Sequence, residues 1–199
     1  RTVECTKEET FEAVNYIFQQ GKRLESLSFK LLELIVAEKQ EYDFRPLCVE
    51  ELVQDAVRLT ETGRKEKEIC LPVRVEKGIM TGDRDLLVSM LTNLLDNARK
   101  AVSEHGQIRI RGRNQAGGYL LSISDNGCGM EEKDLARITE AFYMVDKSRA
   151  RKEGGTGLGM TLCSRILDLH DAKWKISSIP GKGTSIALWF PGEKEGQNI

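Results

Sequence analysis

The chain has 199 residues, which is enough for one domain of ordinary size with a short appendage or for two small domains. Hydrophobic residues make up 40% of it and charged residues 31%, a composition typical of a soluble globular protein, and no apolar run is long enough to span a bilayer. The 30 Lys and Arg residues balance 31 Asp and Glu residues, so the global charge gives no support to binding of nucleic acid or of an anionic membrane.

Residues 6 to about 41 have the pattern of one long helix. Thr6 and Glu9 have the spacing of a capping box. Apolar residues then recur at three- and four-residue spacings and their multiples, at Ile17, Leu24, Leu27, Leu31 and Leu34. A helix of about 30 residues is roughly 45 Å long, and one with such a wide apolar face has to pack on a partner. We predict a bundle or coiled-coil element without chemistry of its own.

The pattern changes to mixed helix and strand after residues 41–46. Residues 49–62 predict an amphipathic helix, and residues 83–102 predict a second one. Residues 69–75 predict a strand, which Pro72 places at a sheet edge because proline cannot donate a ladder hydrogen bond.

Strands dominate the second half of the chain. Strands are predicted over residues 107–113, 119–124, 173–177 and 184–190, and a helix over residues 157–169. A polar stretch covers residues 140–155. The predicted fold class is α/β, with a layer of helices on one mixed sheet, preceded by the long helix.

Three polar residues share one face of the second helix. Asn93, Asn97 and Lys100 are four and three residues apart, beside the apolar stripe rather than within it. A carboxamide oxygen can coordinate Mg²⁺ or accept a hydrogen bond, and a lysine one turn further along the helix can reach a phosphate. The alternative, which is commoner for an isolated N-x-x-x-N pattern, is a plain polar helix flank.

A second stretch, residues 125–130, follows a strand and is rich in glycine. Glycine permits tight turns and a close approach of backbone to a ligand. Asp125, at the strand end, could accept a hydrogen bond from an amino group such as that of adenine. A simple D-N-G turn between strand and helix is the competing interpretation.

A third stretch, residues 154–159, opens a helix, and a glycine-rich helix start with free N–H groups attracts phosphate. It lacks the preceding strand and later acidic residue of the dinucleotide fingerprint, and it lacks the lysine of the P-loop. The basic run before it could be a lid over phosphates or a solvated loop. This run carries Lys147, Arg149, Arg151 and Lys152.

Taken in order, these stretches resemble the GHKL ATPase superfamily, and most closely the catalytic domain of sensor histidine kinases. The match covers residues 44–191, and five motifs in the expected order make it specific. Residues 93–101 resemble the N box, 125–129 the first glycine box, 141–149 the phenylalanine box, 155–159 the second glycine box and 181–184 the closing G-x-G-T element.

The resemblance implies the Bergerat-type two-layer α/β sandwich, with ATP and Mg²⁺ as the bound species. Asp125 would bind the adenine amino group, in a pocket that Gly127 and Gly129 shape and that Thr184 borders. Asn97 would coordinate Mg²⁺, with Asn93 and Lys100 holding the phosphate and metal region as catalytic residues. Further nucleotide contacts are implied for Tyr143, Arg149, Gly155, Thr156, Gly157, Leu158 and Gly159.

The residue at position 93 separates the subclasses of the superfamily. Its hydrolases and serine-directed relatives typically have a Glu there, which activates the nucleophile, whereas Asn93 cannot act as a base. The resemblance therefore implies phosphoryl transfer to a histidine presented from elsewhere, and relay to a response-regulator aspartate. An ATPase or serine kinase, and a nucleotide-sensing or dimerisation module without catalysis, are the alternatives.

The predicted domains are a dimerisation segment over residues 1–43, which lacks the acceptor histidine, a catalytic domain over 44–192 and a tail over 193–199. His105 is expected in a loop and His170 in a structural role, and Met144 departs from the basic residue frequent at its position. The scattered cysteines are expected to be reduced thiols. Expected partners are a response-regulator receiver domain and, through the N-terminal helix, a second copy in the full-length protein; no nucleic-acid partner is expected. The expected location is cytoplasmic, with an upstream anchor in the inner membrane conceivable for the full-length protein.

Overall fold

The computed structural model describes residues 6, 10–18, 21, 42–145 and 156–192. Within this part, no helix combines the length and apolarity that a bilayer crossing requires. The described cysteines, which are Cys48, Cys70, Cys128 and Cys163, are free thiols.

A five-stranded mixed sheet forms one layer of the fold, in the order β2-β4-β5-β7-β6. The strands are β2 (Val73–Val75), β4 (Ile108–Gln115), β5 (Gly118–Asp125), β6 (Lys173–Ile179) and β7 (Gly183–Pro191). β2 pairs parallel with β4, and the other pairs are antiparallel. The edge position predicted from Pro72 is confirmed, although regular pairing begins only at Val73.

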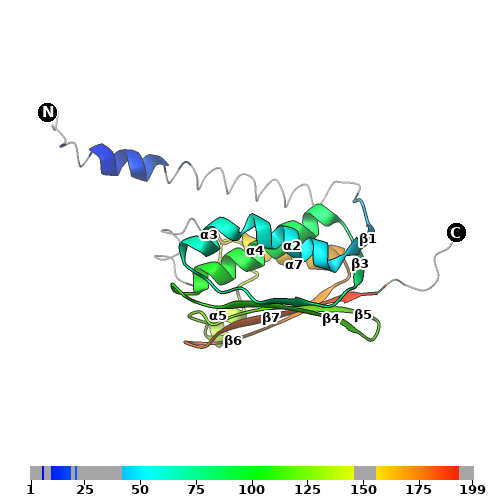
Figure 1. Cartoon of the computed structure of the whole chain (residues 1–199). Coiled ribbons are helices and arrows are strands. Elements are labelled where there is room, and N and C mark those ends of the chain that lie inside the picture. The colour runs from blue at the N-terminus through cyan, green and yellow to red at the C-terminus, as the bar shows by residue number, and fades with distance from the viewer. Residues whose placement is uncertain (1–5, 7–9, 19–20, 22–41, 146–155, 193–199) are drawn as a thin grey trace.

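Three helices form the second layer and cover one face of the sheet, as Figure 1 shows. They are α2 (Val49–Leu59), α4 (Arg84–Ala101) and α7 (Gly159–Leu169). Alternation along β5 turns Tyr119, Leu121 and Ile123 toward the helices, and all three are buried. Leu91 and Leu94 of α4 belong to the same core. The predicted two-layer α/β sandwich is therefore confirmed.

Several short elements differ from the sequence-based expectation. β1 (Arg45–Cys48) and β3 (Ile79–Gly82) form a separate antiparallel pair, which was not predicted. The helix predicted over residues 49–62 is divided at Thr60, whose Oγ1 donates to the carbonyl oxygen of Ala56 at 2.9 Å. Short helices α3 (Glu61–Glu66) and α5 (Glu132–Leu135) were also missed, and α7 begins at Gly159 rather than at 157.

The N-terminal helix is described only in part. Residues 10–18 and 21 are helical, and the amide of Thr10 donates to the carbonyl oxygen of Thr6 at 3.0 Å. Apolar side chains on this segment are exposed, including Phe11 at 69% and Ile17 at 68%. This agrees with a face that needs a partner. Glu9 of the predicted capping box and residues 22–41 lie outside the described residues.

His170 joins the C-terminal end of α7 to the start of α4. Its Nε2 accepts a hydrogen bond from the amide of Asp83 at 3.1 Å, so Nδ1 carries the proton and donates to the Ile166 carbonyl oxygen at 2.7 Å. Asp83 in turn caps α4, because its Oδ1 accepts from the amides of Asp85 and Leu86. Burial lowers the pKa of His170. The structural role predicted for His170 is confirmed, and His105 lies in a loop as expected.

Replacing His170 by Phe should destabilise the fold by about 1–3 kcal/mol at neutral pH, because the partly buried Asp83 amide loses its acceptor. The folded state favours neutral His170, so its contribution to stability is present above the ordinary histidine pKa of about 6.5 and declines as the pH falls below it. Urea unfolding at pH 7.5 and 5.5 should show a weaker pH dependence in His170→Phe than in the wild type. His105→Gln, in an exposed loop, is the control, and equal pH dependence in wild type and His170→Phe contradicts the assignment.

Candidate functional site

A cavity of about 390 Å³ opens between the C-terminal half of α4, the start of α7 and the adjoining ends of β5 and β7. Its size falls within the range of about 300–1,000 Å³ that is usual for small-molecule sites. Its walls are largely apolar, with contributions from Leu94, Ala98, Ile123, Met160 and Ile186. The shape and lining suit a flat apolar group that carries a few polar atoms.

Asp125 is the one carboxylate among the described residues that line this cavity. It is the last residue of the central strand β5 and points to the helix side, as Ile123 does two residues before it. Its Oδ1 accepts hydrogen bonds from the amides of Gly127 at 2.8 Å and Thr184 at 3.3 Å. Burial raises the pKa of Asp125 despite these two donors. Oδ2 has no hydrogen-bond donor among the described residues, so it can accept from a ligand.

Thr184 reinforces the same corner from the neighbouring strand β7. Its Oγ1 lies 2.9 Å from the Oγ of Ser178 on β6. The Oγ of Ser178 also accepts a hydrogen bond from the amide of Met130 at 2.8 Å. The loop after β5 is thereby tied to the β6–β7 hairpin. A Cβ on Gly183 would lie 2.0 Å from the carbonyl oxygen of Asp125, so only glycine lets β7 pass this close.

The C-terminal half of α4 supplies the polar side of the cavity. Asn97 and Lys100 line it, beside the apolar Ala98. The Nζ of Lys100 lies 2.7 Å from a carboxylate oxygen of Asp96, one turn earlier in the helix. Burial acts to raise the pKa of Asp96, but attraction and hydrogen bonds from Lys100 and Arg99 outweigh it, so this pKa lies below its usual value. Asp96 therefore stays ionised and holds the lysine at the cavity margin.

Asn93 lies one turn further from the cavity than Asn97, on the same side of α4. Its Nδ2 donates to the Ser89 carbonyl oxygen at 3.0 Å. It is not among the residues that line the 390 Å³ cavity. A ligand that bound there would therefore reach Asn93 only by extending beyond this cavity along the helix.

The turn of residues 126–130 fits closely against two other elements. The amide of Cys128 donates to the carbonyl oxygen of Ala101 at 3.1 Å, and a Cβ on Gly127 would lie 2.6 Å from that oxygen. Gly129 has a φ of +64°, and a Cβ there would lie 2.1 Å from the carbonyl oxygen of Ile179. Both positions therefore need glycine, and Gly129 lines the cavity.

The glycine-rich segment before α7 lines the opposite wall. Gly157 has a φ of +73°, its carbonyl oxygen accepts from the Phe142 amide at 2.9 Å, and a Cβ would lie 2.7 Å from the Phe142 backbone. Thr156 and Gly159 line the cavity beside it, whereas Leu158 is buried. No side chain of a described residue caps the first turn of α7, so its N–H groups can bind an anion.

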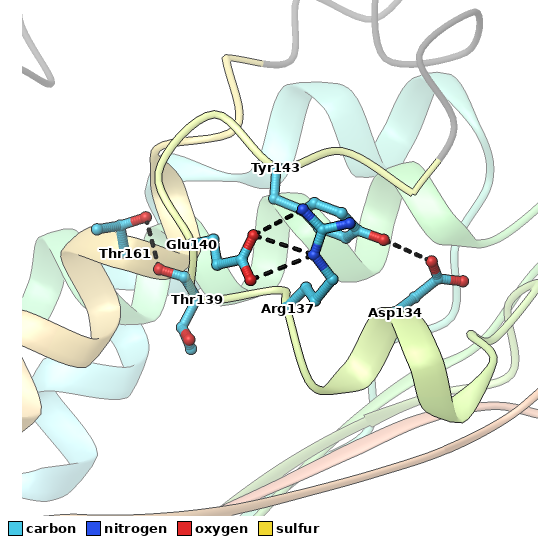
Figure 2. Close-up of polar contacts among 6 residues, drawn as sticks. All are labelled: Asp134, Arg137, Thr139, Glu140, Tyr143 and Thr161. Atoms are coloured by element: carbon cyan, nitrogen blue, oxygen red, sulfur yellow. Dashed lines mark hydrogen bonds and ion pairs between the residues drawn. The ribbon is translucent and has the colours of Figure 1, made fainter.

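Tyr143, in the segment that follows α5, lines the same cavity, and Figure 2 shows its polar contacts. Its hydroxyl donates to Oδ1 of the buried Asp134 at 2.6 Å, and this hydrogen bond raises the pKa of Tyr143. The Arg137 guanidinium carbon lies 4.4 Å from the ring centroid and also pairs with Glu140. The Thr139 carbonyl oxygen accepts from Thr161 of α7 at 3.0 Å. These contacts fix the ring against the cavity.

The structure brings most of the predicted site residues to one place. The cavity is lined by Asn97, Lys100, Asp125, Gly129, Tyr143, Thr156, Gly157, Gly159 and Thr184. Asn93, Gly127 and Leu158 adjoin it without lining it, and Arg149 and Gly155 lie outside the described residues. Sequence reasoning assigned no role to Asp96, Asp134 or the apolar wall. The period-two alternation of β5 and β7 could have identified Ile123 and Ile186.

This arrangement has a definite chemical preference. The apolar slot with a single carboxylate acceptor suits a purine that carries an exocyclic amino group. The amide and ammonium of Asn97 and Lys100, together with the start of α7, suit phosphate groups. No group of three or more His, Cys, Asp or Glu residues within the described ranges could hold a metal ion. A divalent ion would therefore rest on amide oxygen and on phosphate oxygens of the ligand, as Mg²⁺ commonly does.

Residues 82–194 match the family of histidine kinase-, DNA gyrase B- and HSP90-like ATPases. This range contains every residue that lines the cavity.

Curated sensor proteins resemble the chain along most of its length. The phosphate regulon sensor protein PhoR of Pseudomonas aeruginosa is 35% identical over 193 residues, which are 94% of this chain and 43% of that protein. The sensor histidine kinase YkoH of Bacillus subtilis is 30% identical over 188 residues, which are 93% of this chain and 40% of that protein. The chain thus spans less than half the length of these relatives.

Solved structures share the fold. The catalytic domain of histidine kinase ThkA has a TM-score of 0.66 and 24% identity, over 75% of this chain and 95% of that one. The full-length histidine kinase ShkA, determined in complex with AMPPNP, has a TM-score of 0.74 and 23% identity, over 96% of this chain and 41% of that one. At these identities the likeness concerns the fold.

Gly129→Ala should destabilise the chain more than Gly181→Ala. Both glycines have a positive φ, at +64° and +73°. The strain of an alanine in this left-handed conformation should therefore lower the free energy of unfolding of both variants by about 1–2 kcal/mol. The Cβ at Gly129 also clashes with Ile179, whereas a Cβ at Gly181 meets nothing within 4 Å. Chemical unfolding measures the difference. Equal losses of unfolding free energy in the two variants contradict the packing described for this turn.

Proposed function

We propose, from the premise that the chain belongs to the family of histidine kinase-, DNA gyrase B- and HSP90-like ATPases, that it is the ATP-binding catalytic domain of a sensor histidine kinase. In this proposal residues 44–192 form the catalytic domain, residues 1–43 contain one helix of a dimerisation hairpin, and residues 193–199 are a tail. The similarity to sensor proteins over more than 90% of the chain supports the choice within the family.

The observation that carries the proposal is the position of Asp125. A half-buried carboxylate, fixed by two backbone amides on one oxygen, leaves its other oxygen for a donor inside an apolar slot. The adenine amino group is such a donor, and the ring would lie against Ile123, Ile186 and Met160. In the same ring orientation a guanine would instead bring its C6 carbonyl oxygen to this carboxylate, and the two acceptors would repel each other.

The phosphates would extend from the slot along α4 toward the start of α7. Lys100, held by Asp96, would offer a positive charge to them, and the uncapped N–H groups of α7 would bind their oxygens. Asn97 would coordinate Mg²⁺ and Asn93 would assist in the same region. The metal ion, when bound, neutralises charge that builds up on the phosphate oxygens.

The residue type at position 93 supports transfer rather than hydrolysis. Water and serine need a base to remove a proton before or during attack, and an amide cannot do so. A neutral imidazole nitrogen already has a free electron pair. It can attack the γ-phosphorus directly, so that a P–N bond forms while the bond to the bridging oxygen of ADP breaks. The chain would then supply positioning and charge, and the nucleophile would come from a hairpin helix.

Two partners follow from this function. The exposed apolar residues of the N-terminal helix, such as Phe11 and Ile17, would pack in a dimer of the full-length protein. The phosphohistidine would pass its phosphoryl group to the aspartate of a response-regulator receiver domain. Histidine kinase ThkA has been solved in complex with response regulator protein TrrA, and that structure matches 94% of this chain with a TM-score of 0.74 and 22% identity.

Asp125→Ala should weaken binding of AMPPNP with Mg²⁺ roughly 10- to 150-fold. The variant loses a hydrogen bond to a charged group, which contributes about 1.5–3 kcal/mol to the binding free energy. Isothermal titration calorimetry measures the dissociation constant. The wild type should also prefer the adenine nucleotide to its guanine counterpart. Glu51→Ala, at an exposed position on α2, is the control and should bind as the wild type does. Unchanged affinity in Asp125→Ala would mean that the purine pocket is misplaced.

The chain with γ-labelled ATP and Mg²⁺ should not label itself, but should label a separate helical hairpin that carries an acceptor histidine. The label should be acid-labile, as a phosphoramidate is, and Asn97→Ala should reduce its rate of appearance. The hairpin with this histidine replaced by alanine is the control. An acid-labile label on His105 or His170 of the chain is the result that refutes transfer in trans.

A further inference from the structure

No described helix covers most of the sheet face that is turned away from α2, α4 and α7 (Figure 1). The short helix α5 reaches only one end of it, where Glu132 and Leu135 border a hollow shared with Ser177. The strand register defines what the rest of the face displays. Alternation turns the odd-numbered residues of β4 outward, and the pairing continues this face across β5, β7 and β6.

Two cross-strand rows on this face have the same organisation. One row reads Arg113, Leu120, Trp189 and Lys173 across β4, β5, β7 and β6. The next reads Arg74, Arg111, Ser122, Ala187 and Lys175, beginning at β2. In both rows the cations lie on the outer strands, and small or apolar residues lie on the two central strands. We call this arrangement the outer trough.

The trough has cationic walls and an apolar floor. A hollow of about 600 Å³ occupies the side bounded by Arg74, Arg111, Arg113 and Leu120. Leu120 and Trp189 are half-buried, so part of each remains exposed. Trp and Arg are the residue types most enriched at the energetic centres of protein interfaces. The floor therefore offers apolar contact between two rows of positive charge.

The wall cations lack ionic partners within the described part of the chain. Arg74, Arg111, Arg113, Lys173 and Lys175 make no ion pair there. Glu76 is the carboxylate among the described residues that border the hollow, and it accepts a hydrogen bond from the Asn114 amide at 3.1 Å. Arg74 and Arg111 are direct register neighbours, and like charges in this position repel. An anionic partner would remove this repulsion.

The spacing of the walls indicates the kind of partner. Strands lie about 4.8 Å apart, so β4 and β6 are separated by three intervals, or about 14 Å. An α-helix with its side chains is about 10–12 Å across. We propose that the outer trough docks an amphipathic helix of another protein or domain, with its apolar stripe on Leu120 and Trp189 and acidic residues on both flanks facing the cations.

The charge of the whole chain favours a protein partner over a polyanion. The formal net charge is −1 and the sequence pI is about 6.3, so the surface outside the trough is on balance acidic. Domains that bind nucleic acid are usually basic overall, and an extended anionic membrane would meet the acidic remainder as well as the trough. A helix that occupies only the trough avoids this repulsion. The proposal is independent of nucleotide binding.

The test uses the full chain, labelled with ¹⁵N, and a synthetic helical peptide with a Leu stripe flanked by Glu on both sides. The expected result is saturable binding, seen as changes in the NMR chemical shifts of the Trp189 indole N–H and of backbone amides in β5 and β7. These changes should become smaller as the salt concentration is raised. The indole N–H of Trp174, which is on the helix side of β6, should move little. A matched peptide with Gln in place of Glu should bind at least tenfold more weakly.

Variants separate the trough from general charge effects. Two double variants each remove one pair of cations from the trough: Arg111→Gln with Arg113→Gln, and Lys173→Gln with Lys175→Gln. Each should lower the affinity of the chain for the acidic peptide at least tenfold. Arg58→Gln with Lys65→Gln removes two cations from the helix layer and should leave affinity unchanged. The proposal is overturned by equal affinity for the two peptides, by unchanged affinity in both trough variants, or by shifts located elsewhere. Displacement of the peptide by duplex DNA or anionic vesicles at comparable concentration, or self-association of the chain through this face, overturns it as well.

Discussion

One desolvated carboxylate determines much of the geometry around the cavity. Asp125 ends the central strand, and one of its oxygens receives backbone amides from the turn after β5 and from the start of β7. Because a buried carboxylate is unfavourable without such donors, the two segments are held where they can supply them. Glycine at positions 127, 129 and 183 lets these segments approach closely, since each lies where a Cβ would meet backbone. The free oxygen then faces a slot whose width the sheet and α4 set, and the proposed preference for adenine follows from that single acceptor.

The apolar face of α4 packs on the sheet, and its polar face borders the cavity. Its apolar stripe fixes the helix on the sheet through buried residues such as Leu91 and Leu94, while Asn97 and Lys100 border the cavity. Asp96 is partly buried and stays ionised beside Arg99 and Lys100, because their charges keep its pKa below the usual value. Its ion pair with Lys100 limits where the lysine can point. Asn93, one turn earlier, marks the direction in which a longer ligand would extend. The helix thus orders the proposed nucleotide contacts along its own axis.

Sequence alone predicted the features that depend on local pattern. The alternation of β4, the helix predicted over residues 83–102, the edge position caused by Pro72 and the order of the glycine-rich motifs are all properties of neighbouring residues. The β1–β3 pair could not be found in this way, because four-residue strands carry too little periodicity and their pairing joins segments over 30 residues apart. The hydrogen bond from Tyr143 to Asp134 and the ion pair of Asp96 with Lys100 depend on rotamers, which no motif spacing specifies. Arg149 and Gly155 lie outside the described residues.

The link between His170 and Asp83 also bears on how the cavity can change its width. α4 and α7 run antiparallel in effect, since His170 at the end of one is bonded to the cap of the other, and the cavity lies at their opposite ends. The imidazole is thus a pivot that the two helices share, and Asn97 and Gly159 lie toward the other end of the pair, at the cavity. α7 is about 16 Å long, so a swing of about 4° about the pivot moves its first turn by about 1 Å. A rotation this small about the imidazole would therefore change the width of the cavity at the first turn of α7 by about 1 Å.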